Sequence, residues 1–122
     1  MLFNKLGKDG TGKCNLNRLA SATVYGALYE ISASQKYELD AHERGYRTIS
    51  LFLPNFGQSI TYISAASPRR DVPNPYDWYK KLVVTGAKKH HLPVKYLSKL
   101  ESVQIIIDTD FKRRTENLKV LN

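Results

Sequence analysis

The stretch that decides the fold is residues 24–31, with the sequence VYGALYEI. Its side chains alternate with a period of two, which is the pattern of a β-strand, and we expect the strand to extend over residues 22–31. Gly26 lies inside this strand, and a glycine at such a place indicates a bulge or a close approach by another backbone. A short helical stretch follows and ends at a carboxylate, Glu43.

The segments after this strand predict a helix and a β-hairpin. Ser32 or Ser34 is a suitable N-cap for a short helix that continues to about His42. Residues 46–53 and 58–65 are rich in β-forming side chains and flank a Pro-Asn-Phe-Gly turn. These two runs therefore predict an antiparallel hairpin.

The second half of the chain predicts a loop followed by two helices. Residues 67–75 contain three prolines and predict an extended loop. Residues 76–91 predict a helix whose Trp78 lies in the core. Pro93 is well placed at the start of a further helix over residues 94–100, because a missing N–H costs nothing in the first turn.

The two ends of the chain carry less regular patterns. Residues 2–20 are polar and glycine-rich, and predict a strand end followed by an irregular loop. Residues 103–107 are an apolar run, and residues 108–122 form a charged tail that we expect to be partly helical. Asp108 and Asp110 lie beside basic residues, which favours a local salt-linked turn.

Strands interleaved with helices predict an α+β fold. We expect a small mixed or antiparallel curved β-sheet or barrel with flanking helices, in a single domain over residues 1–122. The chain is 42% hydrophobic and 25% charged, as is ordinary for a globular protein, and it has no apolar run long enough to cross a membrane. Its one cysteine, Cys14, cannot form an internal disulfide, so we expect a cytoplasmic protein.

The formal net charge of +8 is a balance found in many nucleic-acid-binding proteins. The basic residues are scattered along the chain, and no arginine-rich tract, zinc-finger spacing or RNA-recognition aromatic motif accompanies them. We therefore rank a nucleic-acid-binding domain last. The basic residues are better interpreted as solvated faces that also attract small anionic substrates.

Two groups of polar residues suggest metal or thiol chemistry at first sight. Residues 88–91 read Lys-Lys-His-His, but adjacent histidines rarely converge on one ion and no further ligand lies at a suitable spacing. At the end of a helix these residues are better interpreted as interacting with the negative end of the helix macrodipole. Cys14, in a polar loop, is expected to be an ordinary thiol. We predict no metal site and no cofactor.

Several motifs follow one another in the order and spacing of a known family. They are VYGALY at 24–29, L-D-x-x-E ending at Glu43 and followed by Gly45-Tyr46, N-P-x-x-x-Y ending at Tyr79, and Gly-Ala-Lys at 86–88 followed by H-L-P-x-x-Y ending at Tyr96. In this arrangement the chain resembles the γ-glutamylcyclotransferase-like family over nearly all of residues 3–111.

The resemblance implies an enzyme that converts a γ-glutamyl amine, amino acid or peptide to 5-oxoproline and a free amine. In such a reaction the α-amino group of the substrate attacks its own γ-carbonyl, so the protein has to move protons and need not supply a nucleophile. Glu43 occupies the position of the family's general acid/base. Without the resemblance, Glu43 would be interpreted as an ordinary surface glutamate.

The resemblance also assigns three tyrosines to the pocket. Tyr46, Tyr62 and Tyr79 fall where the family places tyrosines, whose hydroxyls would bind a substrate carboxylate or hold Glu43. The alternative is that they are half-buried packing residues. Arg44 is a departure, because it separates Glu43 from a glycine that directly follows the glutamate in the family.

A second departure is the absence of the Tyr-Gly-Ser-Asn loop that holds the substrate in the family. We expect a start that is truncated relative to the family; the alternatives are a genuinely shortened relative and a partner chain that supplies the missing strand. The alternative function is a non-catalytic truncated relative that binds a small ligand or a protein. Such a chain would expose an unpaired strand edge and form homo-oligomers through it.

Overall fold

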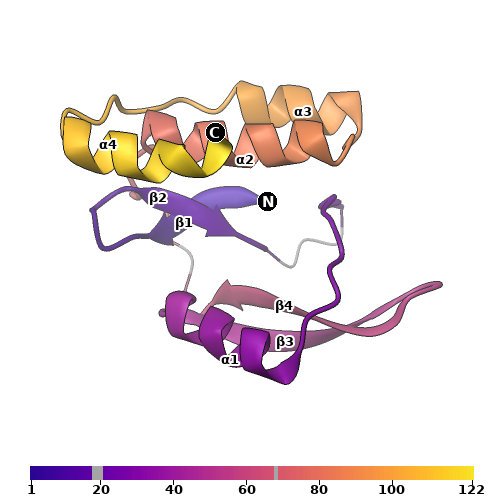
Figure 1. Ribbon diagram of the computed structural model, residues 1–122. Coiled ribbons are helices and arrows are strands. Elements are labelled where there is room, and N and C mark those ends of the chain that lie inside the picture. Colours follow the sequence, from indigo (N-terminus) through magenta and orange to yellow (C-terminus); the bar gives the residue numbers. More distant parts are fainter. Residues whose placement is uncertain (18–20, 68) are drawn as a thin grey trace.

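The computed structural model describes residues 1–17, 21–67 and 69–122, which are arranged in three layers (Figure 1). In that view the helices of the C-terminal part of the chain form the upper layer, the N-terminal hairpin forms the middle layer, and a second hairpin with a helix beside it forms the lower layer. The elements in chain order are β1 (Leu2–Leu6), β2 (Gly12–Asn15), α1 (Ala33–His42), β3 (Tyr46–Leu53), β4 (Gly57–Ser64), α2 (Asp77–Lys89), α3 (Val94–Glu101), α4 (Phe111–Leu118) and a 3-10 helix, Lys119–Leu121.

The predicted α+β fold with antiparallel strands and flanking helices is confirmed. Among the described residues the strands form two separate two-stranded sheets, β1–β2 and β3–β4. They do not join one curved sheet or barrel, because the stretch expected to link them pairs with neither hairpin. No helix in the described parts of the chain is long and apolar enough to span a bilayer.

Helix α1 has Ser32, one of the two predicted residues, as its N-cap, and this residue forms a capping box. The hydroxyl of Ser32 accepts a hydrogen bond from the backbone N–H of Gln35 at 3.2 Å. The side chain of Gln35 in turn accepts one from the N–H of Ser32 at 2.8 Å. Two N–H groups that a helix start leaves unpaired are thereby satisfied. The helix ends at His42, and Glu43 is its C-cap.

The predicted hairpin of residues 46–53 and 58–65 is confirmed as β3 and β4. Eight residue pairs align without a bulge, from Tyr46 opposite Ser64 to Leu53 opposite Gly57. The turn between them needs two residues with positive φ, and Asn55 and Gly57 supply them at 71° and 81°. The register places Tyr46 and Tyr62 on the same face of the hairpin, because Tyr62 lies opposite Thr48.

The expectation of an irregular loop after a strand end within residues 2–20 is wrong for the part of that range the structure describes. β1 and β2 form an antiparallel hairpin, with an irregular register between Leu2 and Lys5. Its turn is closed by Asp9, which accepts hydrogen bonds from the backbone N–H and hydroxyl of Thr11 and pairs with Lys13 at 2.7 Å. Local side-chain bonds therefore order a sequence that composition alone predicts as loop. Residues 18–20, and Pro68 of the predicted loop, lie outside the described residues.

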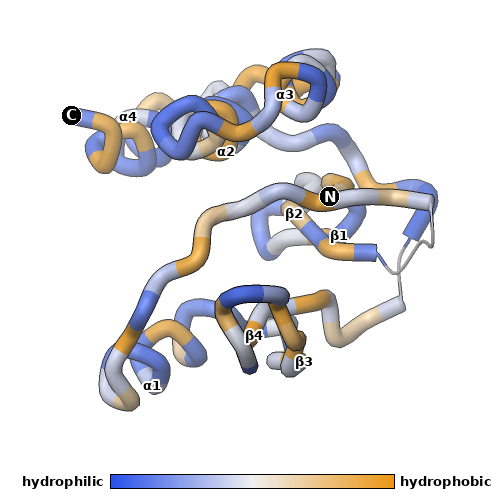
Figure 2. The backbone as a smooth tube through the Cα atoms, turned by 90° about the vertical axis from the view of Figure 1, so that its right-hand side faces the viewer, coloured by the Kyte–Doolittle hydropathy of each residue, from blue (hydrophilic) through white to orange (hydrophobic). Residues whose placement is uncertain are grey.

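The predicted strand over residues 22–31 is also wrong. This stretch, called the open segment below, is extended and exposed along its whole length. No backbone–backbone hydrogen bond joins it to another described residue. Alternation of side chains indicates a strand only where a neighbouring backbone completes the ladder, and no described backbone does so here. Figure 2 shows the open segment crossing the molecule toward α1 with hydrophobic residues along it.

The small core lies between α2, α3 and the first strand. Ala87, Tyr96 and Leu100 are its buried members, and Phe3 and Val83 pack against them. The predicted helices of residues 76–91 and 94–100 are thus confirmed, with ends that differ by one or two residues.

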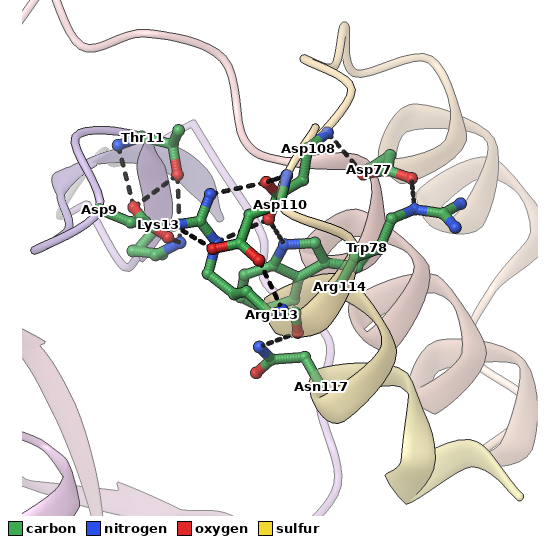
Figure 3. A network of polar contacts seen from close by, with 10 residues as sticks. All are labelled: Asp9, Thr11, Lys13, Asp77, Trp78, Asp108, Asp110, Arg113, Arg114 and Asn117. Atoms are coloured by element: carbon green, nitrogen blue, oxygen red, sulfur yellow. Dashed lines mark hydrogen bonds and ion pairs between the residues drawn. The ribbon is translucent and has the colours of Figure 1, made fainter.

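A buried carboxylate joins the C-terminal tail to α2 (Figure 3). Asp108 is 1% exposed, and its oxygens accept hydrogen bonds from Trp78 Nε1 at 2.8 Å and from the Arg113 guanidinium at 2.7 and 2.6 Å. A second ion pair, between Arg114 and Asp77 at 2.7 Å, lies beside it. The predicted salt-linked turn, the buried Trp78 and the partly helical tail are all confirmed.

Candidate active site

Glu43 lies on the turn between α1 and β3. Its backbone N–H donates to the carbonyl of Leu39 at 2.9 Å, and its carbonyl accepts from the N–H of Tyr46 at 3.1 Å. Gly45 completes this turn with a φ of 82°, a conformation that favours glycine. The side chain of Glu43 is half-buried, whereas Arg44 is exposed. Both helix C-cap and strand start therefore fix the backbone from which the carboxylate projects.

Tyr46, at the start of β3, reaches from this turn to the N-terminal hairpin. Its hydroxyl donates a hydrogen bond to the carbonyl of Cys14 at 2.7 Å. Burial, with the nearby Cys14 thiol and Glu43 carboxylate, raises the pKa of Tyr46 to about 12. The phenol is therefore neutral at physiological pH, and it serves as a hydrogen-bond donor.

Tyr79 approaches the same peptide from the helical layer. Its hydroxyl accepts a hydrogen bond from the N–H of Cys14 at 3.1 Å. Burial holds the pKa of Tyr79 well above its usual value. Cys14 has no partner in the β1–β2 register, which pairs Lys13 and Asn15 on either side of it. The hydroxyls of Tyr79 and Tyr46 thus satisfy the backbone N–H and C=O of Cys14, which the hairpin leaves without a cross-strand partner.

Tyr62 belongs to a different group of contacts. Its hydroxyl donates to Asp40 Oδ1 at 2.5 Å, and the Lys36 ammonium lies 5.4 Å from its ring centroid. Lys36 and Asp40 also form an ion pair within α1. Burial and the hydrogen bond to Asp40 raise the pKa of Tyr62. This group ties α1 to β4 and borders a cavity of about 790 Å³, which is also lined by Leu39 and Ile60.

A lysine that sequence reasoning did not single out completes the surroundings of the turn. The ammonium of Lys5, on β1, lies 4.6 Å from the ring centroid of Tyr46. It also occupies the space beside Gly45, where a Cβ would lie 3.1 Å from Nζ. Lys5 makes no ion pair with any residue in the described ranges. Lys5 reaches this place because β1 pairs with β2 and Tyr46 of β3 bonds to Cys14 of β2, so the sequence contains no local signal for it.

The four predicted site residues are therefore only partly brought together. Glu43 and Tyr46 are neighbours, and Tyr46 is linked to Tyr79 through the peptide of Cys14. Tyr62 bonds instead to Asp40 on α1. Cys14 itself lies in strand β2 and not in a polar loop, and burial raises the pKa of its thiol. A raised pKa leaves little thiolate at neutral pH, as expected for an ordinary thiol.

The geometry can now be compared with known proteins. The model of the AIG2-like family matches residues 23–100, nearly two thirds of the chain. The chain belongs to this family. The AIG2-like family lies within the γ-glutamylcyclotransferase-like superfamily, so the resemblance found in the sequence is confirmed. No curated protein and no solved structure shows significant similarity to the chain.

The AIG2-like match contains part of the site and leaves out the rest. Glu43 and the three tyrosines lie within it, as do Arg44 and Gly45 of the same turn. The hairpin β1–β2, which carries Lys5 and Cys14, lies before its first residue. The turn thus lies inside the matched residues, whereas the contacts that Tyr46 and Tyr79 make with Cys14 are made to a region outside the match.

Proposed function

We propose that this member of the AIG2-like family is a γ-glutamylcyclotransferase-like enzyme. It would convert a γ-glutamyl amine, amino acid or peptide to 5-oxoproline and a free amine. The family match supports the class of chemistry, because it spans the turn that holds Glu43. One structural observation carries the proposal further, and it concerns which carboxylates of the matched region are free to exchange a proton.

Glu43 differs from every other described carboxylate between residues 23 and 100. Asp40, Asp71 and Asp77 are each held in an ion pair with a lysine or arginine. Glu30 and Glu38 are exposed to solvent. Glu43 combines partial burial with the absence of an ion pair to any described residue. This combination suits a carboxylate that transfers protons, since an ion pair favours the charged form and full exposure leaves the proton open to exchange with water.

The proposed reaction requires one carboxylate that acts twice. The α-amino nitrogen of the substrate attacks its γ-carbonyl carbon, and a C–N bond forms while Glu43 takes a proton from that nitrogen. The C–N bond to the leaving amine then breaks, and Glu43 returns the proton to the departing nitrogen. Glu43 is unchanged at the end, and no oxidant or further reactant is consumed.

The residues around the turn have supporting roles in this proposal. Tyr46 holds the backbone of the turn, because its N–H donates a hydrogen bond to the carbonyl of Glu43 and its hydroxyl donates one to the carbonyl of Cys14. Lys5, which pairs with no described carboxylate, adds a positive charge beside Gly45 that attracts a substrate carboxylate. We assign Lys5 to binding and Tyr46 to positioning.

A second candidate function is a non-catalytic binding module of the same family. One observation favours it: the hydroxyls of all three predicted substrate-binding tyrosines already make hydrogen bonds to protein atoms. In this candidate the tyrosines hold the fold together, and a small γ-glutamyl ligand or a protein binds without reaction.

Release of 5-oxoproline from a panel of γ-glutamyl compounds separates the two candidates. We expect release by the wild type and a loss of about 100-fold or more in Glu43→Gln. Glu38→Gln is the matched control, because it makes the same change on an exposed residue of α1 and should keep full activity. No release by folded wild-type protein, together with a ligand-induced rise in melting temperature, would support the binding module and refute the enzyme.

A further inference from the structure

The open segment, residues 22–31, has the sequence of a strand but not the partners of one. Five of its side chains are large, hydrophobic and at least 40% exposed: Val24, Tyr25, Leu28, Tyr29 and Ile31. Its backbone makes no backbone–backbone hydrogen bond within the described parts of the chain. A row of unpaired N–H and C=O groups beside apolar side chains is a template for another strand.

Two side-chain contacts join this segment to the helical layer. The ring of Tyr25 packs edge-on against Tyr96 at a centroid distance of 5.4 Å, and the hydroxyl of Tyr29 lies 2.5 Å from His90 Nε2. Both contacts come from odd-numbered residues and reach the helical layer. Leu28, in the alternate row, is 49% exposed. Both rows of side chains therefore stay largely exposed, and the backbone edges of the segment are not paired with any described backbone.

Space for a second strand lies along both ends of the segment. Its C-terminal half borders the cavity of about 790 Å³ on the side of β4, where Phe56 and Ile60 are exposed. Its N-terminal half borders a cavity of about 680 Å³ formed with residues 93–96 of the α3 start. An extended chain that entered along the segment would find apolar walls at both ends.

The charges around the segment favour a second copy of this chain as the occupant. Residues 21–35 carry a single charge, Glu30, although the whole chain carries a net charge of +8. Edges that avoid association usually carry lysine or proline, and this one carries neither. Lys95 and Lys99 border the N-terminal half, beside Val24 and Tyr25. Two antiparallel copies therefore bring Glu30 of one toward the lysines of the other.

We propose that residues 24–31 of two copies pair as antiparallel strands about a two-fold axis near Ala27 and Leu28. Such an interface uses the same surface on both subunits, so every contact occurs twice. Gly26 lies close to the axis and its backbone is open, since a Cβ built there meets no atom within 4 Å. The proposal does not depend on the enzymatic function, because Glu43 and Tyr46 lie outside the paired residues.

The mass of the full chain in solution tests the proposal by sedimentation velocity over a wide range of protein concentrations. We expect a species of twice the chain mass of 13.9 kDa. Leu28→Lys places two like charges close to the two-fold axis and should weaken the dimer by about 100-fold. Tyr37→Lys is the matched control, because it makes the same apolar-to-lysine change at an exposed position of α1.

A backbone variant and hydrogen exchange keep the test independent of side-chain effects. Ala27→Pro removes one N–H from the proposed ladder and should also give monomers. In the wild type, amides 24–31 should exchange more slowly as the protein concentration rises. A monomer at all concentrations would overturn the proposal, as would a dimer that survives both Leu28→Lys and Ala27→Pro. Protected amides in a monomer would show that another part of the same chain covers the segment, and would overturn it as well.

Discussion

Tyr79→Phe removes the hydroxyl that accepts the N–H of Cys14, and its effect can be worked out from the structure. The hydrogen bond is 3.1 Å long and lies in a largely buried position, where burial also raises the pKa of Tyr79. Cys14 has no cross-strand partner to replace it. An unsatisfied buried donor costs about 1–3 kcal/mol, and we expect the free energy of unfolding to fall by that amount.

Urea unfolding of Tyr79→Phe and of the control Tyr37→Phe measures this cost. Tyr37 is 79% exposed, so its hydroxyl should contribute nothing measurable. Tyr46→Phe removes the opposite bond to Cys14, and the double variant should show coupling between the two phenols. If Tyr79→Phe is as stable as the wild type but loses substrate affinity, the hydroxyl binds substrate and the structural interpretation is refuted.

Three further outcomes follow from burial and charge. Leu100→Ala should lower the free energy of unfolding by about 2–5 kcal/mol, because Leu100 is a core residue at 4% exposure. Val94→Ala, on the exposed face of α3, should leave the free energy of unfolding nearly unchanged. Equal losses in the two variants would contradict the described core. Arg113 holds the pKa of Asp108 well below its ordinary value, so this carboxylate stabilises the fold above about pH 4. The contribution disappears as the pH falls through the lower pKa of the folded state. The acid unfolding of Asp108→Asn should lack that pH dependence, and an acid transition equal to that of the wild type would refute this prediction. Burial raises the pKa of Cys14, so alkylation by iodoacetamide at pH 7 should be slow until urea unfolds the chain, and fast labelling of the folded protein would contradict its placement.

Local sequence signals predicted well those elements whose hydrogen bonds join residues close in sequence. The capping box at Ser32 and the turn at Asn55 and Gly57 need only neighbouring residues, and both were predictable from the chain. The Asp108 turn also follows from charges close in sequence, although its bond to Trp78, thirty residues away, does not. Helices α2 and α3 follow from periodicity and from Pro93.

Features that depend on partners distant in sequence could not be predicted. The alternation of residues 22–31 describes a strand, yet whether a strand forms is decided by a second backbone. The β1–β2 hairpin forms through the side chain of Asp9, in a stretch whose glycines and lysines indicate a loop. In the candidate site, the position of Glu43 followed from the family pattern, whereas Lys5 and the peptide of Cys14 come from a hairpin that the pattern does not include.

The central claim is that Glu43 transfers the proton in 5-oxoproline formation, and the ratio of release rates in Glu43→Gln and Glu38→Gln tests it most directly. Both variants exchange a carboxylate for an amide within six residues of each other, so their net charges match. The account predicts that Glu38→Gln releases 5-oxoproline at the wild-type rate and that Glu43→Gln is slower by about 100-fold or more. Equal rates in the two variants would contradict it.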